Sequence, residues 1–147
     1  MTTEHELVPP LRSLAFALII DGTGHVLLVR HNYNGNYYAL PGGAVESGEL
    51  PQEAAVREIR EELCVEARAT RLLSLFSFVA DGRFQAHVFL AEIIGGTPMH
   101  PGTDEIAEIG WFDPDQLPQP VYITVEHAIA DARRGDYGVL RTFPSAD

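Results

Sequence analysis

A Pro-Gly-Gly turn followed by a glutamate-rich helical segment constrains this chain most, and it occupies residues 40–65. Glu58, Glu61 and Glu62 are three and four residues apart, so on an α-helix they fall within a sector of roughly 100°. At i,i+4 spacing, the carboxylates of Glu58 and Glu62 repel each other by about 0.2–0.5 kcal/mol on an exposed helix. A divalent cation among them removes that repulsion, because Mg²⁺ and Mn²⁺ prefer oxygen ligands. The pattern therefore predicts a metal-binding helix face.

The other positions of this segment predict a helix over residues 50–63 that packs against a sheet. Ser47 or Glu49 is the expected N-cap, and Pro51 suits the first turn. The face opposite the glutamates is apolar and forms the expected buried stripe: Ala55, Val56, Ile59 and Leu63. One helix thus offers a core face and an acidic face.

Arg57 lies at i,i+4 spacing from two acids, Glu53 before it and Glu61 after it. Such pairs hold the guanidinium in place, so we expect Arg57 to orient a metal-ligating carboxylate. In the turn, Gly42 and Gly43 let the backbone approach a bound group closely. The carbonyl of Gly42 is a further candidate metal ligand.

Read from Gly43, the chain gives Gly, five residues, Glu49, seven residues, and then Arg-Glu-Ile-Arg-Glu-Glu-Leu-Cys-Val over residues 57–65. This segment resembles the Nudix box, whose pattern is G, five, E, seven, R-E, an aliphatic residue, any, E-E, any, G, an aliphatic residue. Every defined position matches except Cys64, where the family has glycine. The match covers about a sixth of the chain directly, and so many fixed positions make a strong signal.

Cys64 follows the predicted helix, at a position that often takes the left-handed conformation. Glycine reaches that conformation freely, whereas a cysteine there costs of order 1 kcal/mol. We predict either a positive φ at Cys64 or a slightly different helix exit, with no loss of the metal ligands. A redox or nucleophilic role for this one cysteine is the alternative, and no histidine beside it in sequence favours that role.

The resemblance implies an α/β fold, namely the Nudix-type α/β/α sandwich with a mixed β-sheet between helices. We expect one Nudix hydrolase domain over residues 1–147, with residues 1–12 and 140–147 as loose ends. The other expected elements are strands, paired as two hairpins, and a second helix: strands 14–20 with 25–30, strands 65–80 with 84–94, a strand at 109–112 and a helix at 121–134. For that second helix the expected core residues are Ile123, Ala128, Ile129 and Ala132.

The resemblance also implies a chemistry, because Nudix proteins cleave a nucleoside diphosphate linked to another group, X, by attack of water on phosphorus. The matching positions imply that Glu58, Glu61, Glu62 and the Gly42 carbonyl hold one to three Mg²⁺ or Mn²⁺ ions. Three further positions have roles in the box. Arg57 is the catalytic residue that orients a ligand carboxylate, Gly43 contacts substrate and shapes the turn, and Glu49 fixes the junction of loop and helix.

The general base varies within the family, and here Glu62, Glu58 or a carboxylate from a later loop are the candidates. In some relatives an acid six residues before a tryptophan joins the metal ions, and Glu105 has that spacing from Trp111. We therefore include Glu105 among the expected metal ligands. The alternative is that Glu105 is a solvated loop acid.

Arg30 ends a strand that leads toward the glycine turn, so we expect it to contact a substrate phosphate; an ordinary surface arginine is the alternative. Tyr38 is a candidate for stacking on a base, since aromatic faces accept any base with about 1–3 kcal/mol each. Tyr33 and Tyr37 are further candidates for such stacking, and for Tyr33 packing is the favoured alternative. The histidines without metal-like spacing are read as structural or surface residues: His31, His87, His100 and His127.

Charge and hydropathy exclude several classes of partner. The net charge is −11, and binding of nucleic-acid polymers needs a basic surface, so we expect small nucleotides instead. The longest apolar run, residues 14–20, is too short to span a bilayer, and the first residues do not resemble a secretory signal. One cysteine fits a reducing compartment, so a cytoplasmic location is expected. Relatives are often dimers, which implies a homodimer.

The sequence gives no marker for one substrate, since residues 66–98 show none of the additional patterns that Nudix subgroups carry. The default expectation is a (d)NTP or a small nucleoside-diphosphate derivative. An ADP-ribose or nucleotide-sugar pyrophosphatase is the alternative. Two other classes stay open: a non-catalytic nucleotide-binding sensor module, and an interaction domain whose acidic surface meets a basic partner.

Overall fold

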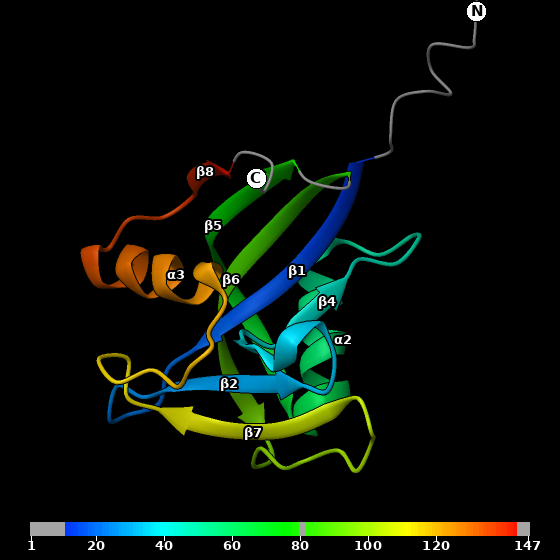
Figure 1. The fold of residues 1–147 in the computed structure, drawn as a ribbon, viewed down its shortest axis with the longest axis vertical. Helices are drawn as coiled ribbons and strands as arrows, with labels where there is room; N and C mark the ends of the chain where they lie inside the picture. The colour runs from blue at the N-terminus through cyan, green and yellow to red at the C-terminus, as the bar shows by residue number, and fades with distance from the viewer. Residues whose placement is uncertain (1–10, 80–81, 144–147) are drawn as a thin grey trace, which may run out of the picture.

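Two β-sheets and two long helices make up the fold in the computed structural model, which describes residues 11–79 and 82–143 (Figure 1). The larger sheet is mixed and has the strand order β4-β1-β6-β5-β8, where β1 and β6 run parallel, as do β5 and β8. Its strands are β1 (Leu11–Ile19), β4 (Gly42–Ala44), β5 (Glu66–Val79), β6 (Arg83–Gly95) and β8 (Val139–Phe143). The smaller sheet is antiparallel, with the order β3-β2-β7: β3 (Tyr38–Ala39), β2 (Val26–His31) and β7 (Ile106–Phe112). A short 3₁₀ turn, η1 (Asn34–Asn36), follows β2.

The helices α2 (Pro51–Leu63) and α3 (Ile123–Arg134) lie on opposite sides of the sheets (Figure 1). Side chains alternate along a strand, so each strand presents one set to each helix. In β1, Leu18 joins the core that contains Val125 and Ile129 of α3, whereas Ala17 joins the core that contains Ile59 of α2. Burial on both faces gives the α/β/α sandwich with a mixed sheet that the family resemblance implies.

The first predicted hairpin is wrong, because β1 and β2 lie in different sheets and meet only at a bridge between Ile20 and Val26. A central strand buried on both faces needs ladder partners on both edges. For β1 these partners are β4 and β6, and β6 runs parallel to it from Leu11↔Arg83 to Ile19↔Ala91. The local turn at residues 21–24 leads the chain out of the first sheet instead of folding it back.

The second predicted hairpin is confirmed, since β5 and β6 pair antiparallel along most of their length. The strand expected at residues 109–112 begins earlier, at Ile106. The end of the chain is more ordered than expected over residues 140–143, which belong to β8. Residues 11 and 12 likewise belong to β1, and the other positions of the two expected loose ends, 1–10 and 144–147, lie outside the described residues.

Helix α3 begins at Ile123, two residues later than predicted, because residues 121 and 122 are held extended beside β3. The backbone N–H of Tyr122 donates to the carbonyl of Tyr38 at 3.0 Å, and Val121 forms a parallel bridge with the same residue. Ile123 was expected in the core but is 45% exposed, and Val125 takes the buried position instead. Ala128 and Ile129 are buried as predicted, and Ala132 packs against the same core.

Buried Asp131 ties α3 to the far edge of the larger sheet. It accepts hydrogen bonds from the Ser74 hydroxyl of β5 and from Arg134, each at 2.8 Å, and it also pairs with Arg141 of β8. Burial acts to raise the pKa of Asp131, but these donors outweigh it and hold the pKa below its usual range. Among the described residues, no helix has the length and apolarity needed to cross a bilayer.

Candidate active site

The glycine turn and the acidic face of α2 press directly against each other. Gly42 has a φ of 152°, and a Cβ there would lie 2.2 Å from the carbonyl oxygen of Ala15. At Gly43 a Cβ would lie 2.7 Å from Oε1 of Glu58. Gly42 therefore admits only glycine, whereas a side chain at Gly43 would displace the Glu58 carboxylate. The backbone N–H of Gly42 also donates to Oε1 of Glu62 at 2.9 Å, which fixes the turn to the helix.

Helix α2 begins by a route that the sequence analysis did not predict. Its N-cap is Leu50, whose backbone N–H donates to Oε1 of Glu53 at 2.8 Å, so the expected caps at Ser47 and Glu49 are wrong. Glu53 caps the helix and does not form the ion pair with Arg57 that the spacing predicted. Glu49 forms an ion pair with Arg57 instead. At the other end, Cys64 has a φ of 59°, which confirms the left-handed alternative of that prediction.

Arg57 is the centre of the junction between loop and helix. Its Nε donates to Oε2 of Glu49 at 2.7 Å, and one terminal nitrogen donates to the carbonyl of Ala44 at 2.9 Å. The other terminal nitrogen donates to Glu58 at 3.0 Å and to Glu61 at 3.1 Å. The guanidinium lowers the pKa of Glu49 chiefly through its hydrogen bond. Arg57 thus fixes Glu58 while Glu49 fixes Arg57.

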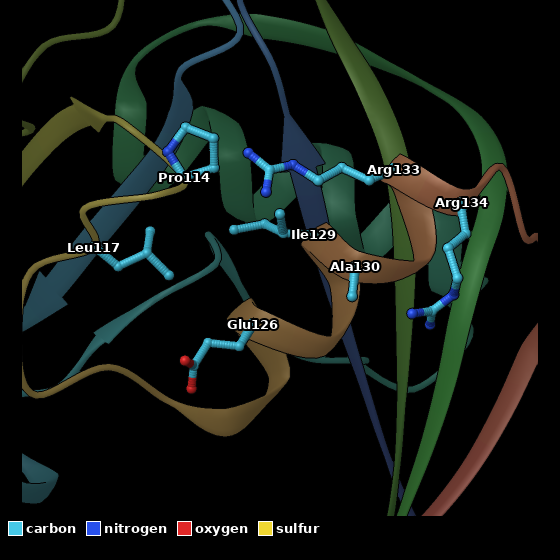
Figure 2. Close-up of a pocket in the computed structure, with 7 residues that line it drawn as sticks. All are labelled: Pro114, Leu117, Glu126, Ile129, Ala130, Arg133 and Arg134. Carbon is cyan, nitrogen blue, oxygen red and sulfur yellow. The ribbon is translucent and has the colours of Figure 1, made fainter.

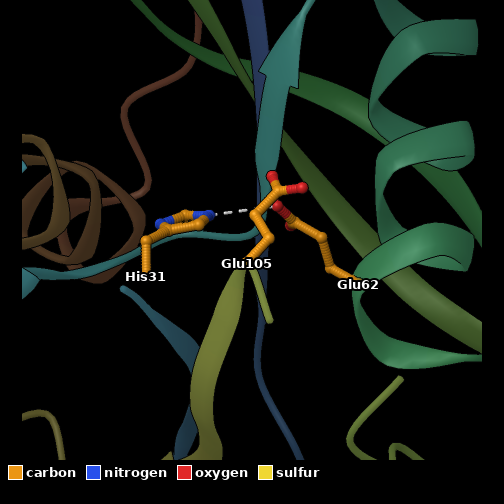
Figure 3. A group of neighbouring side chains, drawn as sticks. All are labelled: His31, Glu62 and Glu105. Atoms are coloured by element: carbon orange, nitrogen blue, oxygen red, sulfur yellow. Dashed lines mark hydrogen bonds and ion pairs between the residues drawn. The ribbon is translucent and has the colours of Figure 1, made fainter. Parts of the chain in front are cut away.

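Three side chains from separate elements meet at the other end of the acidic face (Figure 3). They are His31 at the end of β2, Glu62 of α2 and Glu105 of the loop before β7. One potential ligand atom from each lies within 4.8 Å of the other two. Glu62 is only 5% exposed, and its Oε2 lies 3.2 Å from Nε2 of His31. Figure 3 shows the three side chains pointing toward one another. The hydrogen bond from the Gly42 N–H to Glu62 places this group beside the glycine turn.

Burial and neighbouring carboxylates raise the pKa values of Glu58 and Glu62. Burial, with the charge of Glu62 as the next cause, raises the pKa of Glu58 to about 7 against the pull of Arg57. The pKa of Glu62 is also raised, first by burial and then by Glu105, although His31 and the Gly42 N–H oppose the shift. Acids that are buried together in this way fit a divalent cation, which their oxygen atoms suit.

The structure separates the other predicted site residues into two groups. Glu61 is 58% exposed and bonded to Arg57, so it lies at the rim of the acidic face. Arg30 and Tyr38 bind each other and Glu108 on the smaller sheet. Nε of Arg30 lies 3.3 Å and the Tyr38 hydroxyl 2.8 Å from the same Glu108 oxygen, and the guanidinium lies over the Tyr38 ring. The expected contacts of Arg30 and Tyr38 with substrate therefore have to compete with Glu108.

A cleft of about 620 Å³ opens beside the acidic face, and His31, Gly42 and Gly43 belong to its wall. Most of its lining is apolar, and aromatic rings from five parts of the chain contribute to it: Phe16, Tyr33, Tyr37, Phe78, Phe84 and Tyr122. The rings of Tyr37 and Tyr122 stack with their centroids 4.8 Å apart. Such a wall suits a flat ring whose diphosphate reaches the carboxylates.

His31 and Tyr33 lie in the candidate site, although the sequence favoured a structural or surface role for His31 and favoured packing over base stacking for Tyr33. Tyr33 lines the cleft, and burial together with the charges of Glu105, Glu62 and Glu58 raises its pKa to about 12. Neither residue belongs to a spaced motif. The one available signal was their place directly after a buried strand, where functional loops begin.

A second hollow of about 340 Å³ lies between α3 and residues 114–117, and its lining includes Arg133 and Arg134 (Figure 2). Both arginines are already paired, because Arg133 binds Asp115 and Arg134 binds Asp131, each at 2.8 Å. Among the described residues that line it, this hollow therefore offers no uncompensated cation to a phosphate group, and the acidic cleft is the better candidate.

Comparison with known proteins agrees with this geometry. The NUDIX domain family model matches residues 10–132. A Bacillus subtilis (strain 168) protein named "Putative 8-oxo-dGTP diphosphatase" is 33% identical over 123 residues, which are 82% of this chain and 79% of that protein. An ADP-ribose pyrophosphatase of Methanocaldococcus jannaschii is 36% identical over 106 residues, which cover 69% of this chain and 62% of that protein.

Among solved structures, the MutT NUDIX hydrolase from Burkholderia pseudomallei superposes with a TM-score of 0.76 at 29% identity. That superposition covers 83% of this chain and 98% of the other. The family match spans most of the chain and includes the glycine turn, the acidic face of α2 and Glu105. The chain therefore belongs to the Nudix family of pyrophosphohydrolases.

Proposed function

We propose that this protein is a metal-dependent hydrolase that cleaves the pyrophosphate linkage of a small nucleotide, with a (d)NTP or a nucleoside diphosphate linked to X as substrate. One observation carries the proposal: ligand atoms of His31, Glu62 and Glu105 lie within 4.8 Å of one another, beside an aromatic-lined cleft whose wall includes His31, Gly42 and Gly43. Glu58 lies against Gly43 of the same wall. The raised pKa values of Glu58 and Glu62 support a role in which a cation completes the group.

The residues that would hold Mg²⁺ or Mn²⁺ are Glu58, Glu62 and Glu105, with the carbonyl of Gly42 and with Glu61 at the rim. A divalent ion in such a group neutralises charge on a diphosphate and makes a nearby water more acidic. The chain's own contribution is to fix the ligands. Glu62 is locked by the Gly42 N–H and by His31.

Arg57 and Glu49 act together on Glu58 in this proposal. Arg57 donates to Glu58 at 3.0 Å, and Glu49 holds the guanidinium from the opposite side at 2.7 Å. Arg57 thus fixes Oε1 of Glu58, and the same oxygen lies nearest the Gly43 backbone, where a Cβ would come within 2.7 Å of it. The carboxylate that accepts the proton of the attacking water would be one of Glu58, Glu62 and Glu105, since Glu62 and Glu105 are grouped with His31 of the cleft wall and Glu58 lies against Gly43 of that wall.

The cleft supports a nucleotide as the substrate class. Its volume of about 620 Å³ lies within the range of small-molecule sites. Tyr33, Tyr37 and Tyr122 line the part of the wall that continues from His31, so a base stacked there keeps its phosphates near the carboxylates. The net charge of −11 favours a small, metal-bound anion over a nucleic-acid polymer.

Relatives point to two substrate groups within this class. The relative whose name contains 8-oxo-dGTP diphosphatase favours a (d)NTP, and it is covered along most of its length. The ADP-ribose pyrophosphatase favours the alternative of a nucleoside diphosphate linked to a sugar, although the chain spans less than two thirds of that protein. Both reactions need the same diphosphate end of the cleft.

A nucleotide panel with Mg²⁺ or Mn²⁺, read by the mass of the products, tests the proposal and identifies the bond that is cleaved. We expect metal-dependent cleavage that falls about 100-fold or more in Glu62→Gln, because the amide keeps the shape but not the charge. Glu126→Gln, on the exposed face of α3, is the matched control and should retain turnover. Nucleotide-dependent thermal stabilisation with no turnover of any nucleotide would instead identify a sensor module.

A further inference from the structure

We propose that Asn32 is a positioning residue that holds the backbone of Glu105 where its carboxylate can join the metal-binding group. The inference rests on the proposed function, because it needs Glu105 to act as a ligand. Asn32 follows β2 directly, and Glu105 directly precedes β7, so the pair lies where these two strands leave the smaller sheet.

A bulge between β2 and β7 brings the two residues opposite each other. Arg30 pairs with Glu108, but His31 pairs with Ile106, so the register shifts by one residue at this point. An unbroken register would place Asn32 opposite Ile106. With the shift, the backbone N–H of Asn32 instead donates to the carbonyl of Glu105 at 3.0 Å.

The side chain of Asn32 adds a second bond to the same loop. Its Nδ2 donates to the carbonyl of Asp104 at 2.6 Å, so two consecutive carbonyls accept from one residue. The second bond needs an amide or another donor at this reach. Aspartate has the same shape but would place a carboxylate oxygen against the carbonyl oxygen of Asp104.

His100 holds the loop from its other side. Its Nε2 lies 2.6 Å from the carbonyl of Ile106, and its Nδ1 accepts from the backbone N–H of Gly102 at 2.9 Å. The N–H of Met99 donates to the carbonyl of Leu63 at 3.0 Å, which anchors the loop to the end of α2. The loop is therefore tied to α2 and to β7, and Asn32 supplies its tie to β2.

The tie matters because Glu105 itself is exposed. An exposed glutamate has many rotamers, so its place within 4.8 Å of His31 and Glu62 depends on a fixed backbone. Figure 3 shows the Glu105 side chain reaching across to Glu62 from its own strand end. Loss of the Asn32 amide bond should therefore affect metal affinity more than it affects the fold.

The test is a calorimetric titration of Mn²⁺ into the whole protein, carried out on the wild type, Asn32→Ala and Asn32→Asp. We expect the Mn²⁺ Kd to rise roughly 10-fold in Asn32→Ala, as for other groups that orient a ligand. Asn32→Asp adds a negative charge near the group, so electrostatic attraction alone would tighten Mn²⁺ binding. Positioning predicts that Asn32→Asp weakens binding as Asn32→Ala does, and tighter binding in Asn32→Asp would overturn the inference.

A double-mutant cycle separates positioning from general destabilisation. If Asn32 acts through Glu105, then Asn32→Ala should not change the Mn²⁺ Kd further in a Glu105→Gln background. A full effect in that background would contradict the inference, and so would an unchanged Kd in Glu105→Gln alone. Thr103→Ala, an exposed change in the same loop, is the control and should leave the Kd within about twofold of the wild type. Failure of the proposed function differs from all of these outcomes, because wild-type protein would then either bind no Mn²⁺ or bind it without cleaving any nucleotide of the panel.

Discussion

Replacing Glu58 with glutamine should stabilise the metal-free protein at neutral and higher pH. The side chain of Glu58 is 16% exposed, and burial together with Glu62 raises its pKa from 4.5 to about 7. The folded state therefore holds the proton more tightly than the unfolded state does. Ionising Glu58 therefore costs more in the folded state than in the unfolded state. As the pH rises from 4.5 to about 7, this cost lowers the unfolding free energy, and above about pH 7 the loss of stability is complete.

The free-energy cost of ionising Glu58 in the folded state follows from its pKa shift. Each pKa unit corresponds to about 1.36 kcal/mol, so the full shift would correspond to about 3.4 kcal/mol. Solvent screening at a site that opens into a cleft reduces this figure, and we expect about 1.5 kcal/mol. Glutamine keeps an oxygen that can accept the Arg57 hydrogen bond, so the substitution removes the charge with little change in packing.

Urea denaturation with a chelator present, at about pH 4 and about pH 8, measures the effect. Glu58→Gln should match the wild type at about pH 4, below the range from 4.5 to about 7, and exceed it by about 1.5 kcal/mol at about pH 8. With Mg²⁺ at about 100 times its Kd the order should reverse, because ion binding stabilises the wild type by about 2.7 kcal/mol. Glu126→Gln should show neither effect. A variant that is equally destabilised at both pH values, with no response to Mg²⁺, would refute the reasoning.

Three further substitutions test other parts of the account. Cys64→Gly should raise the unfolding free energy by about 1 kcal/mol, since it relieves a positive φ, whereas Cys64→Ala keeps the Cβ and should not. Asp131→Asn should lower the unfolding free energy by about 3 kcal/mol near pH 7, because Arg141 loses its charged partner. The pKa of Asp131 is lowered, so this difference should shrink as the pH falls below 3.8; a constant difference in urea melts would contradict it. Tyr33→Ala should raise KM about 10-fold through lost stacking, and a fall in kcat with KM unchanged would contradict that role.

The acidic face of α2 was predictable because its geometry is local. A helix repeat of about 3.6 residues places Glu58 and Glu62 together whatever surrounds them. The close packing of Gly43 on Glu58 involves the same segment, because only residues 45–50 separate β4 from α2. The left-handed Cys64 was also predictable, because the position after a helix favours that conformation.

The pairing of β1 was not predictable, because the local turn after Ile19 suggested a hairpin and the true partner, β6, comes much later in the chain. His31 lies beside Glu105 because β2 leaves the smaller sheet there, at a bulge that the residue pattern did not predict. Charge pairs were mis-assigned where two acids competed for one arginine, as Glu49 and Glu53 did for Arg57. These strand pairings and ion pairs depend on which distant segments of the chain are buried against each other.

The central claim is that the carboxylates beside the glycine turn bind a divalent ion that acts on a diphosphate. Titration of Mn²⁺ into the wild type and Glu62→Gln, each with and without a nonhydrolysable α,β-methylene nucleotide, tests it most directly. We predict that the analogue tightens Mn²⁺ binding to the wild type about 10-fold, as expected for coupled ligands, and has no such effect on Glu62→Gln. Equal Mn²⁺ affinity in the two proteins, unaffected by the analogue, would contradict the claim.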